Sequence, residues 1–182
     1  MRVAADLTES EVTVLGLIAE RPRHGFDLEK VIDERGMRQW TQIGFSSIYY
    51  LLGKLDKRGL IEEVAVEAGG PGRPRRVYAI TPAGRAAAAE RTAQLLAEPS
   101  VAAAPVLVGM ANWPLLPPAE SIAALRRRSE ALSRKRVEVT AARDAQRPLP
   151  DFVDAVFEYS VAMLDAEQSW VARTLTSLER KR

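Results

Sequence analysis

The sequence contains no cysteine and only one histidine, His24, in 182 residues. Without cysteine the chain can form no disulfide framework, no thiol nucleophile and no thiolate zinc site, and one imidazole is too little for a triad or a metal centre. A phosphate-binding loop, a nucleophile elbow and the glycine pattern of dinucleotide-binding folds are missing too. We therefore expect no enzyme activity, no cofactor and no bound metal.

A large excess of charge and long apolar runs are also absent. The 26 Lys and Arg residues nearly balance the 24 Asp and Glu residues, so the net charge is +2 and any nucleic-acid-binding surface must be local. The longest nearly apolar run, residues 101–111, is far shorter than the ~20 residues of a membrane span, and the first residues lack the apolar core of a signal peptide. We expect a folded cytoplasmic protein without a membrane partner.

The first part of the chain shows three helical patterns. A capping box at Thr8 and Glu11 opens an apolar segment that ends before Pro22, and a second short helix is expected over residues 26–34, after His24 in a local structural role. The third pattern places apolar residues at i, i+3, i+4 and i+7, which predicts a helix over residues 46–58 that is closed by Gly59. Its buried stripe consists of Ile48, Leu51, Leu52 and Leu55.

Two alternating segments, residues 62–67 and 75–81, flank the glycine-rich turn at residues 69–72, which predicts a β-hairpin. Tyr78 lies on the second strand and is expected in the core. Thr81 and Pro82 then begin another helix. Three helices followed by a hairpin with a basic tip is the order of a winged helix-turn-helix, which we assign to residues 1–97.

Residues 98–182 are expected to form a second, helical domain. A connector with a short helix near residues 106–112 precedes a long helix that begins after Pro117-Pro118, and a final helix covers about residues 151–179. The apolar stripe of the final helix is too wide for one antiparallel neighbour to cover, so we predict an antiparallel helical dimerisation domain. The predicted dimer interface contains Leu125, Leu132, Val139, Val156, Phe157, Met163, Leu164, Trp170, Val171, Leu175 and Leu178.

Four apolar residues of this second domain, Trp113, Phe157, Met163 and Trp170, could line a cavity between two subunits. Large apolar side chains at helical spacing are also typical of a plain dimer core, so both interpretations stay open.

The face opposite the buried stripe of the third helix carries Ser46, Tyr50, Lys54 and Lys57. Hydroxyl and ammonium groups on one helix face can contact base edges and phosphates in a major groove, although an ordinary solvated face has the same composition. The hairpin tip adds Arg73, Arg75 and Arg76, which suit a minor groove or its flanking phosphates. A basic loop that only keeps the hairpin soluble is the alternative. The two features together favour DNA binding.

Three segments resemble the PadR family of bacterial transcriptional regulators: HGFDLEK at residues 24–30, SSIYYLLGKLDKRGLI at residues 46–61 and RRVYAITPAG at residues 75–84. The second half resembles the shorter, Vir-like type of the family, and Phe26 stands where tyrosine is common. The resemblance implies a homodimer with exchanged C-terminal helices that binds a pseudo-palindromic operator in double-stranded DNA. Several members of the family are repressors released by small aromatic or hydrophobic compounds bound near the dimer interface, so the resemblance also implies a small hydrophobic or aromatic effector, with Trp113 and Trp170 as candidate contacts. The DNA-binding residues then expected are Ser46, Ser47, Tyr49, Tyr50, Lys54, Lys57, Arg73, Arg75 and Arg76.

Two rival interpretations remain. A MarR-type winged-helix regulator would carry dimerisation helices at both ends of the chain, and the segment before Thr8 is short for that arrangement. A protein-interaction adapter that does not bind DNA would use the winged helix as a scaffold and the last helix to bind a partner.

Overall fold

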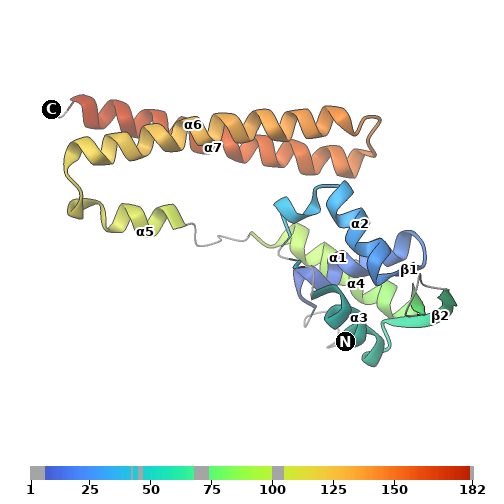
Figure 1. Ribbon diagram of the computed structural model, residues 1–182. Coiled ribbons are helices and arrows are strands. Elements are labelled where there is room, and N and C mark those ends of the chain that lie inside the picture. The colour runs from blue at the N-terminus through green and yellow to red at the C-terminus, as the bar shows by residue number, and fades with distance from the viewer. Residues whose placement is uncertain (1–6, 42, 45–46, 68–73, 100–104, 181–182) are drawn as a thin grey trace. The chain divides into compact units, whose positions relative to one another are not determined.

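A computed structural model describes residues 7–41, 43–44, 47–67, 74–99 and 105–180. It divides into two compact units, Met1–Val101 and Ala102–Arg182, which we call the N-terminal and C-terminal units (Figure 1). Within the described ranges, no helix has the length and apolar character needed to cross a bilayer. The elements, in chain order, are α1 (Glu9–Glu20), β1 (Arg23–His24), α2 (Gly25–Glu34), η1 (Met37–Gln39), α3 (Ser47–Lys57), β2 (Ile61–Glu67), β3 (Arg75–Ile80), α4 (Pro82–Ala97), α5 (Pro105–Ala111), η2 (Trp113–Leu115), α6 (Pro118–Ala145) and α7 (Asp151–Arg180).

The N-terminal unit is the winged helix that the sequence predicts, mainly helical with a small sheet, and this fold class is confirmed. Its core is one apolar cluster to which α1, α2, α3 and the strands all contribute. The predicted stripe of α3 is buried throughout, and Tyr78 is 7% exposed, as expected for a core residue. Side chains that are almost completely buried here include Leu15, Ile18, Leu28, Ile32, Ile48, Leu55, Leu60 and Ile61.

Local signals explain where these helices begin and end. Thr8 accepts a hydrogen bond from the Glu11 backbone, and the Glu11 side chain accepts one from the Thr8 backbone, so the capping box of α1 is complete. Helix α3 ends at Lys57, and Gly59, two residues later, has a φ of 67° in the left-handed region that glycine enters at low cost. The Leu60 amide reaches back to the Leu55 carbonyl at 3.0 Å, which satisfies the last turn.

The sheet contains one strand that the sequence did not predict. The two residues of β1 pair antiparallel with β3, Arg23 opposite Tyr78 and His24 opposite Val77, so the strand order is β1-β3-β2. Because a two-residue strand has no detectable alternation, composition gives no signal for it. Its pairing joins the base of the wing to the start of α2.

The C-terminal unit is an antiparallel hairpin of α6 and α7, with α5 and η2 ahead of it (Figure 1). Ion pairs set the register of the two long helices: Arg143 with Asp154, Arg136 with Asp165, Arg128 with Glu167 and Arg126 with Glu179. Very little of this unit is buried. Its buried residues are Ser121, Ile122, Leu125, Val139 and Val171.

Candidate nucleic-acid interface

The outward face of α3 is strongly exposed. Tyr50 is 70% exposed and Tyr49 is 57% exposed, while Lys57 is also on the surface and makes no ion pair with any residue that the structure describes. Ser47 is half-buried at the first position of the helix. Two neighbouring exposed tyrosines on the face opposite the buried stripe make this face a candidate contact surface.

Tyr49 is oriented by a glycine of the neighbouring helix. A Cβ atom at Gly25, the first residue of α2, would lie 2.6 Å from Cε1 of the Tyr49 ring. No real side chain tolerates that distance, so the close approach of the ring requires glycine at this position. The ring lies beside the Gly25 backbone, and Tyr49 as a whole is 57% exposed, so it is not a core residue.

The base of the wing is held against the same helix start. The Arg75 guanidinium carbon lies 4.9 Å from the centroid of the Phe26 ring, a cation–π contact, and the Phe26 ring lies 6.3 Å from that of His24. Arg76 pairs with Glu63 of β2 through Nε and Oε2 at 3.5 Å. Both arginines remain exposed.

These contacts bring α3 and the wing together. Tyr49 of α3 touches Gly25, and Arg75 of β3 stacks on the next residue, Phe26, so residues from the two predicted DNA-binding elements meet at consecutive positions of one helix start. Ser46 and Arg73, together with the rest of the glycine-rich turn, lie outside the described residues.

The orientation of Lys54 differs from the prediction. Its position on the helix suggested an outward side chain, but Nζ lies 3.1 Å from Oε1 of Glu11, a residue of α1 with no exposed surface. Arg58 Nη1 lies 3.0 Å from the same oxygen. The long, flexible lysine stem can curl back over the helix to a buried carboxylate, which a projection at 100° per residue ignores. A DNA contact by Lys54 stays a prediction.

Burial by itself raises the pKa of Glu11, but hydrogen bonds from Thr8 and Lys54 and the charge of Lys54 outweigh it, and the net effect lowers the pKa. Glu11 is thus a carboxylate that joins the first turn of α1 to the last turns of α3. The sequence revealed only the capping role of Glu11. Its ion pairs link residues 43 and 47 positions apart, and no local pattern predicts them.

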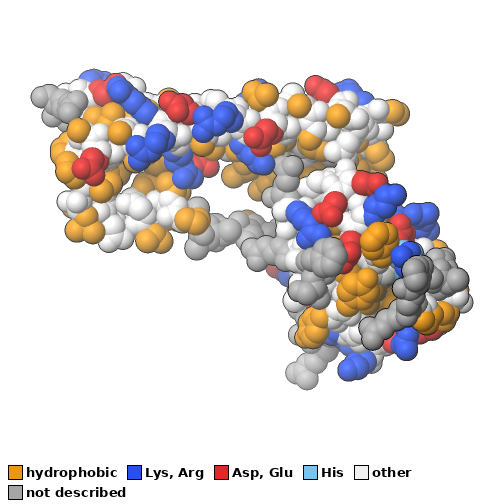
Figure 2. All heavy atoms as spheres, viewed as in Figure 1, with side chains coloured by type: hydrophobic (Ala, Val, Ile, Leu, Met, Phe, Trp, Pro, Cys, Tyr) orange, Lys and Arg blue, Asp and Glu red, His pale blue; other side chains and the backbone are white. Residues whose placement is uncertain are grey.

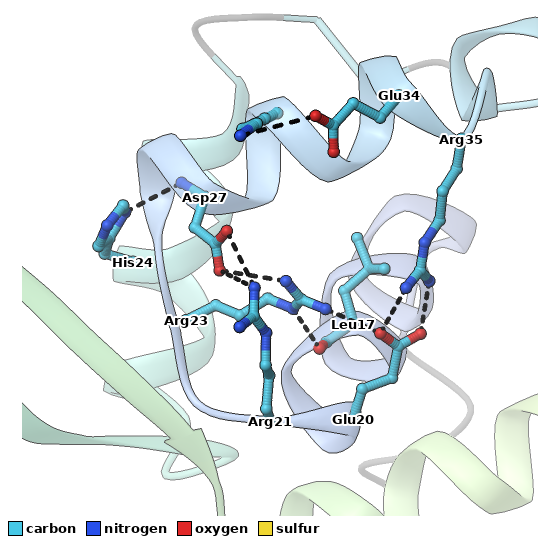
Figure 3. A network of polar contacts seen from close by, with 9 residues as sticks. Leu17, Glu20, Arg21, Arg23, His24, Asp27, Glu34 and Arg35 are labelled. Carbon is cyan, nitrogen blue, oxygen red and sulfur yellow. Dashed lines mark hydrogen bonds and ion pairs between the residues drawn. The ribbon is translucent and has the colours of Figure 1, made fainter.

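A second polar network fixes α1 against α2 (Figure 3). Arg23, whose side chain is 3% exposed, donates to the Leu17 carbonyl at 2.9 Å and pairs with Glu20 and Asp27. Arg35 holds the other side of Glu20 through two hydrogen bonds and is the main reason why the pKa of Glu20 is lowered.

His24 caps α2, because its Nδ1 accepts a hydrogen bond from the Asp27 amide at 2.9 Å. This observation confirms the local structural role predicted for His24. Among the described residues no group of three or more potential metal ligands occurs.

In the C-terminal unit, the eight residues of α7 that are predicted for a dimer interface separate into two stripes. Five of them share the side of the buried Val171, facing α6: Phe157, Leu164, Val171, Leu175 and Leu178. The other three, Val156, Met163 and Trp170, lie about 100° away around the helix. Together with Phe152 and Tyr159 they form what we call the outer stripe, in which Phe152, Val156, Tyr159 and Met163 are exposed. Figure 2 shows apolar side chains between basic and acidic ones along this hairpin.

Leu125, Val139 and Val171 are already buried within the single chain, by the contact between α6 and α7. Leu132 is half-buried on α6. These four residues therefore pack the hairpin within one chain, and their place in a dimer interface stays a prediction. The prediction of a dimer interface rests on the outer stripe.

The four residues predicted to line an effector cavity are not gathered in one place. Met163 and Trp170 share the outer stripe, Phe157 lies on the inner side of α7, and Trp113 belongs to η2. A hollow in this unit is instead lined by Ala119, Ile122, Ala123, Arg126, Arg127, Glu130 and Glu179. The effector site stays a prediction.

Comparison with known proteins confirms the family resemblance. Residues 14–90 match the model of the Transcriptional regulator PadR-like family, whose members are regulators and not enzymes. No curated protein has a sequence that matches this chain.

Solved structures share the fold along nearly the whole chain. PadR of Bacillus subtilis in complex with operator DNA is similar with a TM-score of 0.76 at 17% identity, over 94% of this chain and 99% of that one. PadR of the same organism in complex with p-coumaric acid has a TM-score of 0.74 at 18% identity, over 93% and 98%. The virulence activator AphA of Vibrio cholerae has a TM-score of 0.71 at 16% identity, over 94% and 99%.

Proposed function

Because its residues 14–90 belong to the PadR-like family of transcriptional regulators, we propose that this protein is a cytoplasmic repressor that binds a pseudo-palindromic operator as a homodimer. One observation carries the proposal: Tyr49 of α3 and Arg75 of the wing meet at Gly25 and Phe26. This adjacency supports one continuous surface on which a helix face and a basic hairpin act together.

In the proposed complex α3 lies in the major groove. Tyr50 and Lys57 stand exposed on its outward face, where a hydroxyl and an ammonium group reach base edges and phosphates. Ser47 and Tyr49 lie at its start, beside the groove edge in this proposal, and Ser46, which precedes them in the sequence, is the further residue expected to contact DNA there. Arg75 and Arg76, with Arg73, contact phosphates or the adjacent minor groove and add affinity for any duplex.

The outer stripe of α7 supports the homodimer. An apolar stripe exposed along a helix hairpin with so few buried residues is energetically unfavourable in water, and a second copy of the same stripe would cover it. A two-fold dimer presents two α3 helices to one face of the duplex, which requires half-sites about 34 Å apart or at a multiple of that spacing.

The ligand class follows from the same stripe. Met163 and Trp170 offer a polarisable and an aromatic surface, and a small aromatic or hydrophobic effector that binds there in one dimer geometry would shift the equilibrium away from the DNA-binding geometry. PadR of Bacillus subtilis has been solved with p-coumaric acid, so this compound is the first effector to test.

The decisive experiment measures the affinity for the DNA upstream of the protein's own gene, and for a scrambled duplex, over a range of salt concentrations. Replacing Arg75 and Arg76 by Ala should weaken binding to both duplexes and reduce the salt slope by about one unit for each lost phosphate contact. Tyr50→Ala should weaken binding to the upstream duplex more than binding to the scrambled duplex. Arg134→Ala on α6 is the control, because it removes one exposed arginine from the other unit. Absence of a shifted band with either duplex, the behaviour of an adapter, would refute the proposal.

The effector is tested by titrating p-coumaric acid into the preformed complex. Release of DNA at a ligand concentration that leaves Trp170→Ala protein bound to DNA would support a site at the outer stripe. Equal release from both proteins would place the ligand elsewhere, and no release would exclude this compound as the effector.

A further inference from the structure

One cation of α3, the helix proposed to lie in the major groove, forms an ion pair within the protein. Lys54 Nζ lies 3.1 Å from Oε1 of Glu11 in α1, and Arg58 Nη1 lies 3.0 Å from the same oxygen. The Lys54 side chain is 38% exposed, so its ammonium lies at the surface although its partner has no exposed surface at all. A basic residue at the edge of a DNA-binding helix would ordinarily be expected to pair with a phosphate.

Moving Lys54 onto a phosphate would disturb Glu11. The carboxylate would keep the Arg58 contact and the Thr8 amide at 2.8 Å, but it would lose one of its two cations while buried. A buried carboxylate that loses a charged partner is destabilised far more than a surface ion pair, so the intramolecular pair competes effectively with DNA for Lys54.

The same carboxylate connects two helices. Through the Thr8 backbone it belongs to the first turn of α1, and through Lys54 and Arg58 it grips the C-terminal end of α3. The outward face of α3 is therefore presented at an angle that depends on this contact. Tyr49 and Tyr50 precede the gripped turn on the same helix.

Building on the proposed function, we propose that Glu11 is a positioning residue of the DNA-binding surface, which keeps Lys54 off the DNA backbone and holds α3 at the angle required for sequence preference. Lys54 then contributes nothing to the electrostatic affinity of the normal protein. Neutralising Glu11 releases this cation, which adds a phosphate contact that is independent of sequence.

The test uses the full chain and two variants, Glu11→Gln and Lys54→Met, each with the same pair of duplexes from about 50 to about 200 mM salt. Lys54→Met, which keeps the stem of the side chain, should leave the salt slope unchanged. Glu11→Gln should steepen the slope by about 0.9, the value for one additional phosphate contact, and should narrow the affinity ratio between the upstream and the scrambled duplex. The double variant Glu11→Gln, Lys54→Met should return to the original slope.

Two outcomes would overturn the inference. A fall of about 0.9 in the slope for Lys54→Met alone would mean that Lys54 already binds a phosphate. An unchanged slope and affinity ratio for a folded Glu11→Gln protein would mean that Glu11 has only a structural role. Lys54→Met keeps the inference testable if Glu11→Gln does not fold, because Glu11 retains the Arg58 ion pair and the Thr8 amide in that variant, and a fall in its salt slope still overturns the inference. If the unaltered protein binds neither duplex, the proposed function fails instead.

Discussion

The two units of this chain use similar helices with very different results. In the N-terminal unit three helices and a sheet enclose a continuous apolar cluster, whereas in the C-terminal unit two helices of about thirty residues bury only five side chains between them. Two helices have one contact surface and cannot enclose a core. The apolar cluster of the N-terminal unit is therefore enclosed within one chain, whereas the C-terminal unit leaves the outer stripe of α7 uncovered.

Breaking ion pairs in the two units should give the largest difference in folding stability between them. Arg23→Met removes a buried guanidinium that serves Leu17, Glu20 and Asp27, and should destabilise the N-terminal unit by about 3 kcal/mol. Arg126→Met, the control, breaks the exposed pair with Glu179 in the C-terminal unit and should cost less than about 1 kcal/mol. Chemical denaturation measures both changes. Equal costs would contradict the assignment of the buried network.

Replacing a glycine by alanine in each unit tests how tightly the two units are packed. A Cβ at Gly84 of α4 would lie 1.9 Å from the Leu60 carbonyl oxygen, so Gly84→Ala should destabilise the protein by about 2 kcal/mol or more. A Cβ at Gly109 of α5 meets no described atom within 4 Å, and Gly109→Ala should be neutral or stabilising by up to about 1 kcal/mol. Thermal melting distinguishes them, and similar melting temperatures would show that α4 can shift away from Leu60.

Within the C-terminal unit, the inner and outer stripes of α7 should respond differently. Val171→Ala removes two buried methyl groups and should cost about 1.5 kcal/mol at every protein concentration. Met163→Ala, at a side chain that is 53% exposed, should leave a dilute single chain almost unchanged but weaken self-association. Sedimentation equilibrium combined with melting at several concentrations tests this. A concentration-independent loss for Met163→Ala would argue against a second copy on the outer stripe.

The smallest expected effect concerns Glu29 of α2, which is buried and has an Oε1 without a hydrogen-bond partner. Burial is the main reason why the pKa of Glu29 is raised; Arg38 opposes the shift and Asp33 adds to it. The folded protein therefore favours the protonated acid, and stability from this group is present at low pH and lost as the pH rises through the folded-state pKa. Glu29→Gln should raise the melting temperature at neutral pH and change it little near pH 4.

Glu20→Gln should change stability with pH in the opposite direction to Glu29→Gln. The pKa of Glu20 is lowered by Arg35, so its stabilisation is present above the pKa of the unfolded chain and disappears as the pH falls through the folded-state value. This variant should be less stable than the normal protein at neutral pH and approach it in acid. The same pH trend for both variants would be inconsistent with the two environments.

The sequence was a good guide wherever the signal was local and periodic. The Thr8–Glu11 capping box, the buried stripe of α3 and the Gly59 terminus were each visible within a few neighbouring positions, and the structure has all three. The long helices were located by their bounding prolines, and α6 and α7 begin and end within a few residues of the predicted limits. The winged-helix fold follows from the order of these elements.

Contacts between distant parts of the chain were not predictable in this way. Periodicity identified the apolar surface of α7 but could not tell which stripe α6 would cover, because both contain large apolar residues about 100° apart. The engagement of Lys54 by Glu11 and the stacking of Arg75 on Phe26 likewise depend on how elements are packed together. The sequence therefore predicted which residues form the candidate surface better than it predicted what each of them contacts.

The contact between Gly25 and Tyr49 means that a substitution at one of these positions affects which residues are tolerated at the other. A Cβ at position 25 would lie 2.6 Å from the tyrosine ring, so a larger residue there requires the ring to turn away or position 49 to become smaller. Substitutions at the two positions are therefore expected to be coupled, and a change at Gly25 would alter the exposed face of α3 through Tyr49.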